Sequence, residues 1–278
     1  MLKRLFVAGT ALASVGAAIG FMKVRAQFRT WGIDAEEAAK PLPGDEIVQN
    51  AEAIDTRGID IGAPPKDVWP WLVQMGYGRA GWYSYDELDM DRPSADRIMP
   101  ELQHLEIGDL LPTHPAGGFV VKVIEPRKAL VVYADRSLVQ EQAEAARAEG
   151  TSLEDASTNV RATGMYLDKS MPGDFQASWA FVLEPQEDNR TRLIERFRGH
   201  MELPSEGTTP PFAPALASKA LLFGLFVMVR RQMLGIRDRV EGRPISHSPW
   251  RALRRDIRAK AMDARAKGVG GATAPTPA

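Results

Sequence analysis

The residues best suited to chemistry are a few acids and tyrosines set among apolar side chains. Glu195 lies in a strand-like stretch in which Leu193 and Phe197 alternate with it and so share its face. If that face points inward, the carboxyl enters an apolar setting, where an unpaired charge is costly and the pKa rises. We therefore expect Glu195 either to pair with a cationic side chain or to act as a functional acid.

The second candidate group is residues 82–86, which place three aromatic residues in four positions ahead of an acid. Tryptophan and tyrosine combine a large apolar ring with one hydrogen-bonding tip, which suits the wall of a ligand cavity. Tyr83, Tyr85 and Asp86 could also exchange protons with a bound substrate. The alternative is that the rings fill space between short helices and a sheet.

Several kinds of chemistry are not indicated by the sequence. The chain has no cysteine, which excludes disulfides, thiolate metal sites and cysteine nucleophiles. Its four histidines lack metal-ligand spacing, and neither a GxSxG nucleophile motif nor a glycine-rich phosphate loop is present. The net charge of −1 gives no bias toward nucleic acid. We expect no metal, no cofactor and no nucleic-acid partner.

The first residues predict a membrane anchor. Residues 5–22 are uncharged and would extend about 27 Å as a helix, close to the hydrocarbon thickness of about 30 Å. A cleaved signal peptide is the alternative, although its apolar region is usually shorter. Basic residues flank both ends, so the side of the membrane stays open. Gly16 and Gly20 form a small-xxx-small pair through which two anchors could pack as a homodimer.

The elements that must position the candidate residues follow downstream. Residues 30–54 contain acids, proline and glycine and are typical of a linker. Residues 56–61 alternate as a first strand, and residues 66–75 have helical spacing after two prolines. Turn residues then separate short apolar runs, which predicts an antiparallel sheet. These strand-like runs are residues 109–111, 119–124, 130–133, 178–183 and 192–197.

The sequence also predicts a polar insertion in this sheet and an arginine-rich face on its last strand. A polar excursion at residues 136–174, helix-forming at 139–149, separates the last two strands from the earlier ones. On the final strand, the face opposite Glu195 carries Arg192, Arg196 and Arg198, which we expect to form an exposed ladder.

The C-terminal third predicts two helices. Residues 214–241 carry an apolar stripe at three- and four-residue steps, and its uncharged core is too short to cross a bilayer. A buried helix is therefore expected there. Residues 251–267 have seven basic and two acidic residues, which is typical of a helix on an anionic membrane surface or of a solvated basic helix. The chain thus divides into an anchor (1–29), a linker (30–54), a folded domain (55–241) and a basic, finally disordered tail (242–278).

Several motifs across residues 55–241 resemble a known superfamily. Residues 59–71 (IDIGAPPKDVWPW) look like the first strand and helix of START/Bet v 1-like (SRPBCC) domains. Residues 78–89 (GRAGWYSYDELD) and 233–237 (MLGIR) resemble a bacterial, membrane-anchored branch of it. The excursion and the basic tail depart from the pattern, which leaves the mouth of any cavity undefined.

The resemblance implies a helix-grip fold of the α+β class, a curved antiparallel sheet wrapped around a long C-terminal helix with a hydrophobic cavity between them. Members bind lipids, sterols, polyketides or aromatic compounds, and a minority are enzymes. Three readings stay open: a binding module for a hydrophobic small molecule or lipid at a membrane, a polyketide-cyclase or dehydrase-like enzyme using Glu195, Asp86 or Tyr85, and a partner-binding module with a filled core. The candidate ligand-binding residues are Trp71, Trp82, Tyr83, Tyr85, Trp179, Phe181, Leu193, Phe197, Phe226 and Met233.

Overall fold

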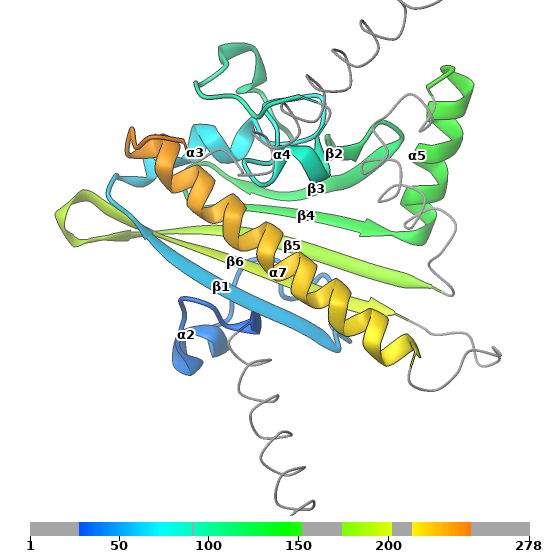
Figure 1. Ribbon diagram of the computed structural model, residues 1–278, viewed down its shortest axis with the longest axis horizontal. Coiled ribbons are helices and arrows are strands. Elements are labelled where there is room, and N and C mark those ends of the chain that lie inside the picture. The colour runs from blue at the N-terminus through cyan, green and yellow to red at the C-terminus, as the bar shows by residue number, and fades with distance from the viewer. Residues whose placement is uncertain (1–27, 91, 152–173, 202–212, 246–278) are drawn as a thin grey trace, which may run out of the picture. The chain divides into compact units, whose positions relative to one another are not determined.

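The computed structural model describes residues 28–90, 92–151, 174–201 and 213–245, and the side chains of its last helix from Phe223 onward. Six antiparallel strands form one curved sheet in the order β1-β6-β5-β4-β3-β2 (Figure 1). This confirms the predicted α+β class and antiparallel sheet. The strands are β1 (Ala53–Ile61), β2 (Leu110–His114), β3 (Gly117–Glu125), β4 (Ala129–Asp135), β5 (Phe175–Gln186) and β6 (Arg190–Met201).

The first and last strands of the chain lie side by side. β1 pairs with β6 from Ala53 opposite Gly199 to Ile61 opposite Thr191 without a register shift. Because side chains alternate along a strand, this register decides which residues of the two strands share a face. Glu195 and Arg57 are directly opposite each other and therefore point the same way.

Short helices fill the connections. α3 (Pro65–Val73) follows β1, with proline at its first turn, where no backbone N–H is needed, and Pro70 inside it. α5 (Arg136–Ala148) is capped by Asp135, whose carboxylate accepts a hydrogen bond from the Leu138 N–H at 2.8 Å. The predicted excursion therefore starts as a helix packed beside β3 and β4. The other short elements are α2 (Ala35–Ala39), α4 (Asp86–Asp89), η1 (Pro100–Leu102) and η4 (Glu187–Asn189).

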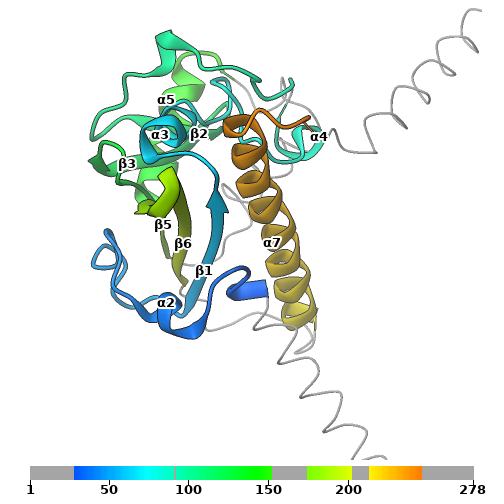
Figure 2. The same cartoon turned by 90° about the vertical axis from the view of Figure 1, so that its left-hand side faces the viewer.

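α7 (Ala213–Val240) runs along one side of the sheet, as Figures 1 and 2 show together. It contacts α3 and β1, and the side chains of Met233 and Ile236 are completely buried. The expected burial is thereby confirmed for the C-terminal half of the helix, whereas Phe223 and Leu225 are exposed. Within the described ranges, no helix is both long and apolar enough to cross a membrane. The predicted anchor, with Gly16 and Gly20, and the tail beyond residue 245 lie outside those ranges.

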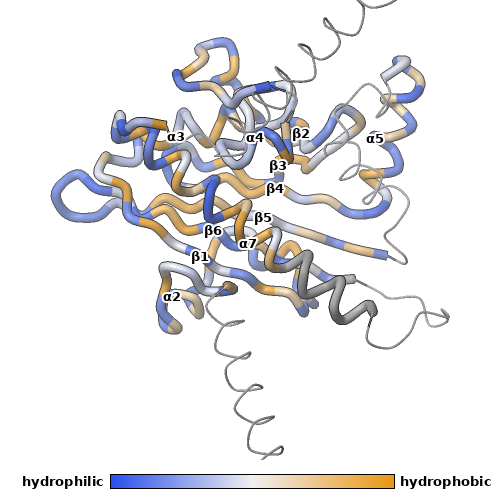
Figure 3. Tube along the Cα trace, viewed as in Figure 1, coloured by the Kyte–Doolittle hydropathy of each residue, from blue (hydrophilic) through white to orange (hydrophobic). Residues whose placement is uncertain are grey.

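The main core lies between α7, α3 and the inward face of the sheet. In Figure 3 the middle of the sheet is apolar, and the β5–β6 turn at its left-hand end is polar. Burying such surface contributes roughly 25 cal/mol per Å² and is the main force that holds the helices on the sheet. Residues that are completely buried in this cluster include Ile61, Leu72, Met75, Leu130, Phe181, Leu193, Met233 and Ile236.

The arginines of β6 do not form the exposed ladder that their alternation suggested. Arg196 is buried and donates hydrogen bonds to Asp45 Oδ2 at 2.6 Å, to Thr56 Oγ1 at 3.0 Å and to the Ala38 carbonyl at 2.7 Å. Arg192 pairs with Glu37 at 2.8 Å, and Arg198 donates a hydrogen bond to the Val48 carbonyl. The prediction was wrong because these arginines are satisfied by acids and carbonyls more than a hundred residues away in sequence.

Their partners belong to the segment expected to be a linker. Residues 33–48 lie on the outer face of the sheet, where Leu42 joins a second buried cluster with Val131, Val182 and Ile194. In Figure 2, α2 and α7 lie on opposite sides of β1. The folded unit therefore begins well before residue 55, and both faces of the sheet are covered near β6.

Candidate functional site

Glu195 lies in the middle of β6 on the inward face of the sheet. Its neighbours on that face are Leu193 and Phe197 on its own strand, Phe181 on β5 and Arg57 on β1. The residue is 1% exposed. The alternation predicted from the sequence therefore carries the carboxyl into the core.

The Glu195 carboxyl is only half satisfied. The Trp179 indole N–H donates to Oε2 at 3.2 Å, while Oε1 is buried and has no hydrogen-bond partner among the described residues. Burial raises the pKa of Glu195 to about 8, against the opposing effects of the Arg57 charge and the Trp179 hydrogen bond. The carboxyl is consequently protonated in much of the population near neutral pH, and an O–H is then available as a donor.

Arg57 does not neutralise Glu195 because other groups occupy its guanidinium. It donates to Asp55 Oδ2 at 3.2 Å and to the Phe28 carbonyl at 3.0 Å. Asp55 also accepts from Arg29 at 2.7 Å. Two arginines therefore converge on Asp55, and Glu195 receives only the longer-range field of Arg57. Sequence reasoning missed Asp55 and Arg57, although both alternate with Ile59 and Ile61 along β1.

Aromatic rings border the carboxyl. Trp179 stacks on Trp82 at 5.6 Å between ring centroids and meets the edge of Phe119 at 6.1 Å. The Arg57 guanidinium lies over the Phe226 ring of α7 at 5.8 Å. Trp179, Phe226 and Phe197 are all partly exposed. A buried acid is thus flanked by ring faces that the protein does not cover completely.

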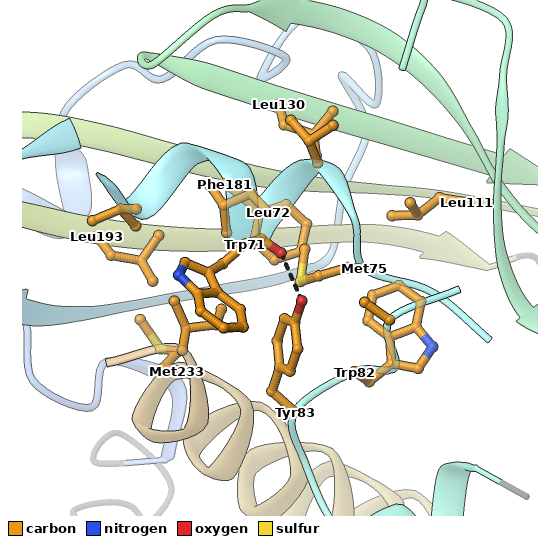
Figure 4. Packing of buried hydrophobic residues seen from close by; sticks show 14 of the residues in the cluster. Trp71, Leu72, Met75, Trp82, Tyr83, Leu111, Leu130, Phe181, Leu193 and Met233 are labelled. Carbon is orange, nitrogen blue, oxygen red and sulfur yellow. Dashed lines mark hydrogen bonds between the residues drawn. The ribbon is translucent and has the colours of Figure 1, made fainter. Parts of the chain in front are cut away.

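The other candidate residues pack against one another. Trp71, Tyr83, Leu193 and Met233 lie in the dense part of the core shown in Figure 4, together with Phe181. They come from α3, α7, β5, β6 and the loop before α4. They fill the space beneath the C-terminal half of α7. For Tyr83 this agrees with the alternative that the aromatic rings of residues 82–86 fill space between short helices and the sheet.

Tyr83 is locked in place through both its backbone and its hydroxyl. Its φ of 58° is unusual for a residue with a side chain, and its N–H donates to Ser94 Oγ at 3.0 Å. The hydroxyl donates to the Trp71 carbonyl at 3.1 Å and accepts from the Gln74 amide at 2.9 Å. Burial raises the pKa of this hydroxyl. It is engaged in structure and is not a hydrogen-bond partner of Glu195.

Replacing Tyr83 by phenylalanine is expected to lower the free energy of unfolding by about 1–3 kcal/mol, because the Trp71 carbonyl and one Gln74 N–H lose their buried partner. Urea denaturation followed by tryptophan emission measures the change. Tyr133→Phe is the matched control, since its hydroxyl bonds to Asp135 in a partly exposed position. Equal losses in the two variants would contradict the role assigned to Tyr83.

The remaining acid candidates form a separate group at α4. Asp86 accepts a hydrogen bond from Ser94 Oγ, and Tyr85 precedes the helix in a partly exposed position. Burial, with the charges of Asp86 and Glu87 nearby, raises the pKa of Asp89 to about 8. Across the described ranges, no group of three or more histidine, aspartate or glutamate side chains could hold a metal ion.

Comparison with known proteins adds little to this geometry. A scan against protein-family models finds no match, and a search of curated proteins finds none. Among solved structures, the chain is similar to a conserved protein from Geobacillus kaustophilus at 13% identity and a TM-score of 0.30, covering 68% of this chain and 96% of that chain. A likeness of this size carries no weight for fold family or function.

Proposed function

We propose that the chain is a helix-grip protein of the START/Bet v 1-like type that binds an apolar small molecule or lipid beside Glu195. The strand order, with β1 next to β6 and α3 between β1 and β2 in sequence, supports this fold type. So does the position of α7 along the inward face of the sheet. The sequence motifs at residues 59–71 and 78–89 point the same way.

One observation carries the proposal: the buried, partnerless Oε1 of Glu195 lies among partly exposed rings. An unsatisfied buried oxygen costs free energy, which a ligand group that accepts or donates a hydrogen bond there would recover. An apolar ligand body would cover Trp179, Phe197 and Phe226. The chemical class that fits both needs is a hydrophobic molecule with one polar carbonyl or hydroxyl group.

The proposed setting is a membrane. Residues 5–22 would act as a single-pass anchor that holds the folded unit close to a reservoir of apolar ligands.

The test is binding by the full-length chain in detergent micelles. Small molecules that copurify from the native membrane are identified by mass spectrometry and then titrated back, with the emission of Trp179 and Trp82 as the readout. Glu195→Leu removes both the donor and the acceptor and is expected to weaken binding about tenfold, the value of one buried hydrogen bond. Ile107→Ala, in an exposed turn before β2, is the control and should bind normally. Absence of any copurified molecule or saturable signal would sink the proposal.

An enzyme of the polyketide-cyclase or dehydrase type is the second candidate, favoured by the Glu195 pKa of about 8, which suits a general acid at neutral pH. Incubating the identified ligand with the chain and analysing it by mass spectrometry separates the two functions. Chemically altered ligand, lost in Glu195→Gln, indicates catalysis. Unaltered ligand indicates binding alone.

A further inference from the structure

Large apolar side chains are exposed in the middle of α7, at the point where its described side chains begin. Phe223 is 50% exposed and Leu225 is 41% exposed. The C-terminal half of the same helix buries Met233 and Ile236 completely. Phe223 and Leu225 are two residues apart, so their side chains lie on different sides of the helix. A large exposed ring beside other apolar side chains is typical of an interaction surface.

Phe28, the first described residue, lies beside this part of α7. The Phe28 ring lies 5.3 Å from the ring of Phe223 and 4.8 Å from that of Phe226. Arg57 donates a hydrogen bond to the Phe28 carbonyl, and Arg29 forms an ion pair with Asp55. Phe28 and Arg29 are therefore bound both to β1 and to α7.

Residues 5–22 end six residues before Phe28. Six residues span at most about 20 Å when fully extended. A bilayer that contains residues 5–22 therefore has its hydrocarbon edge within about 20 Å of the Phe28 ring. The polar layer between hydrocarbon and water is itself about 5–8 Å thick on each side.

The rim of this surface suits that polar layer. Arg230, on the next turns of α7, lies over the Trp31 ring at 5.1 Å, and Arg29 is partly exposed. Tryptophan and arginine are the side chains that favour the boundary between lipid headgroups and water, and arginine attracts lipid phosphates.

We propose that Phe28 and Phe223 form a membrane-docking surface that rests on the bilayer in which residues 5–22 are inserted. This inference rests on the proposed anchor and is independent of the Glu195 site. Docking removes the exposed rings from water and gives the folded unit one fixed orientation. Phe226, which contacts both Phe28 and Arg57, would then connect the bilayer surface to the region of Glu195.

The absence of cysteine allows a direct test by single nitroxide labels. Phe223→Cys is labelled in the full chain and reconstituted in vesicles of phosphatidylcholine and phosphatidylglycerol in equal parts. Leu225→Cys, on another side of the same helix, is labelled for comparison. Collision with oxygen, which concentrates in lipid, is compared with collision with a water-soluble nickel complex. Ile107→Cys, at an exposed turn next to β2 on the sheet edge opposite β1, is the control.

We expect the label at position 223 to have an oxygen-to-nickel accessibility ratio severalfold above those of the labels at 107 and 225. Equal ratios in vesicles that carry the chain on flotation would overturn docking while leaving the anchor intact. Failure of the chain to float with vesicles would overturn both. Ligand titration in micelles is unaffected by either result, so failure of the binding proposal is detected separately.

Discussion

Replacing Gly235 by alanine is expected to lower the free energy of unfolding by several kcal/mol. A Cβ at this position would lie 2.1 Å from the Tyr83 carbonyl oxygen and 3.0 Å from the Tyr83 Cβ. Tyr83 cannot retreat, because its backbone has a positive φ and its hydroxyl and N–H are bonded to Trp71, Gln74 and Ser94. α7 must therefore move away from the loop, which opens the core.

Gly224→Ala in the same helix is the matched control for that experiment. Nothing lies within 4 Å of a Cβ built there, so alanine should stabilise the helix by up to about 1 kcal/mol through its higher helix propensity. Urea denaturation of the full-length chain followed by tryptophan emission gives both values. A Gly235→Ala variant as stable as the parent would show that α7 does not press on the Tyr83 loop.

The second large effect concerns pH. Glu195 has a folded-state pKa of about 8, above its ordinary value of 4.5. Between these values the unfolded chain releases the proton and the folded chain keeps it, so stability falls as pH rises through this window. The loss is on the order of a few kcal/mol. Glu195→Gln removes the ionisable group and, with it, about half of the decline expected between pH 5 and pH 8.

Asp89 has to be tested alongside Glu195. Its pKa is also about 8, so it contributes a decline of the same sign in the same window. Asp89→Asn should remove that share, and the double variant should be nearly flat. Denaturation at several pH values measures the four slopes. If Glu195→Gln keeps the full parental slope, the carboxyl is ionised in the folded protein and paired more closely with Arg57 than the hydrogen bonds indicate.

The sheet and the two main helices were predictable because their patterns are local. Alternation along β6 correctly placed Leu193, Glu195 and Phe197 on the inward face, and the stripe that contains Met233 and Ile236 correctly predicted the buried side of α7. Periodicity shows which face is buried, but it does not show which residues lie opposite. β1 was accordingly predicted to start three residues late, and Asp55 fell outside the predicted strand.

The residues around Glu195 could not be predicted, because they depend on strand pairings that a local sequence pattern does not show. Arg57 is opposite Glu195 only because β1 and β6 are neighbours in one particular register. The same limit explains the outer face, where Arg196 looked exposed until the residues around Asp45 supplied its partners. A segment rich in proline and acids is typical of a linker, yet three apolar residues and three arginines hold it against the sheet.

The pairing of β1 with β6 also determines when the sheet can be completed during translation. At ~5–20 residues per second, the ribosome needs on the order of ten seconds to synthesise the stretch from Ala53 to Gly199. Throughout that time β1 has no partner strand, and its backbone N–H and C=O groups form an open edge. Nascent chains that terminate before Arg190 never acquire β6. Such products keep that edge open and are therefore candidates for aggregation or chaperone capture.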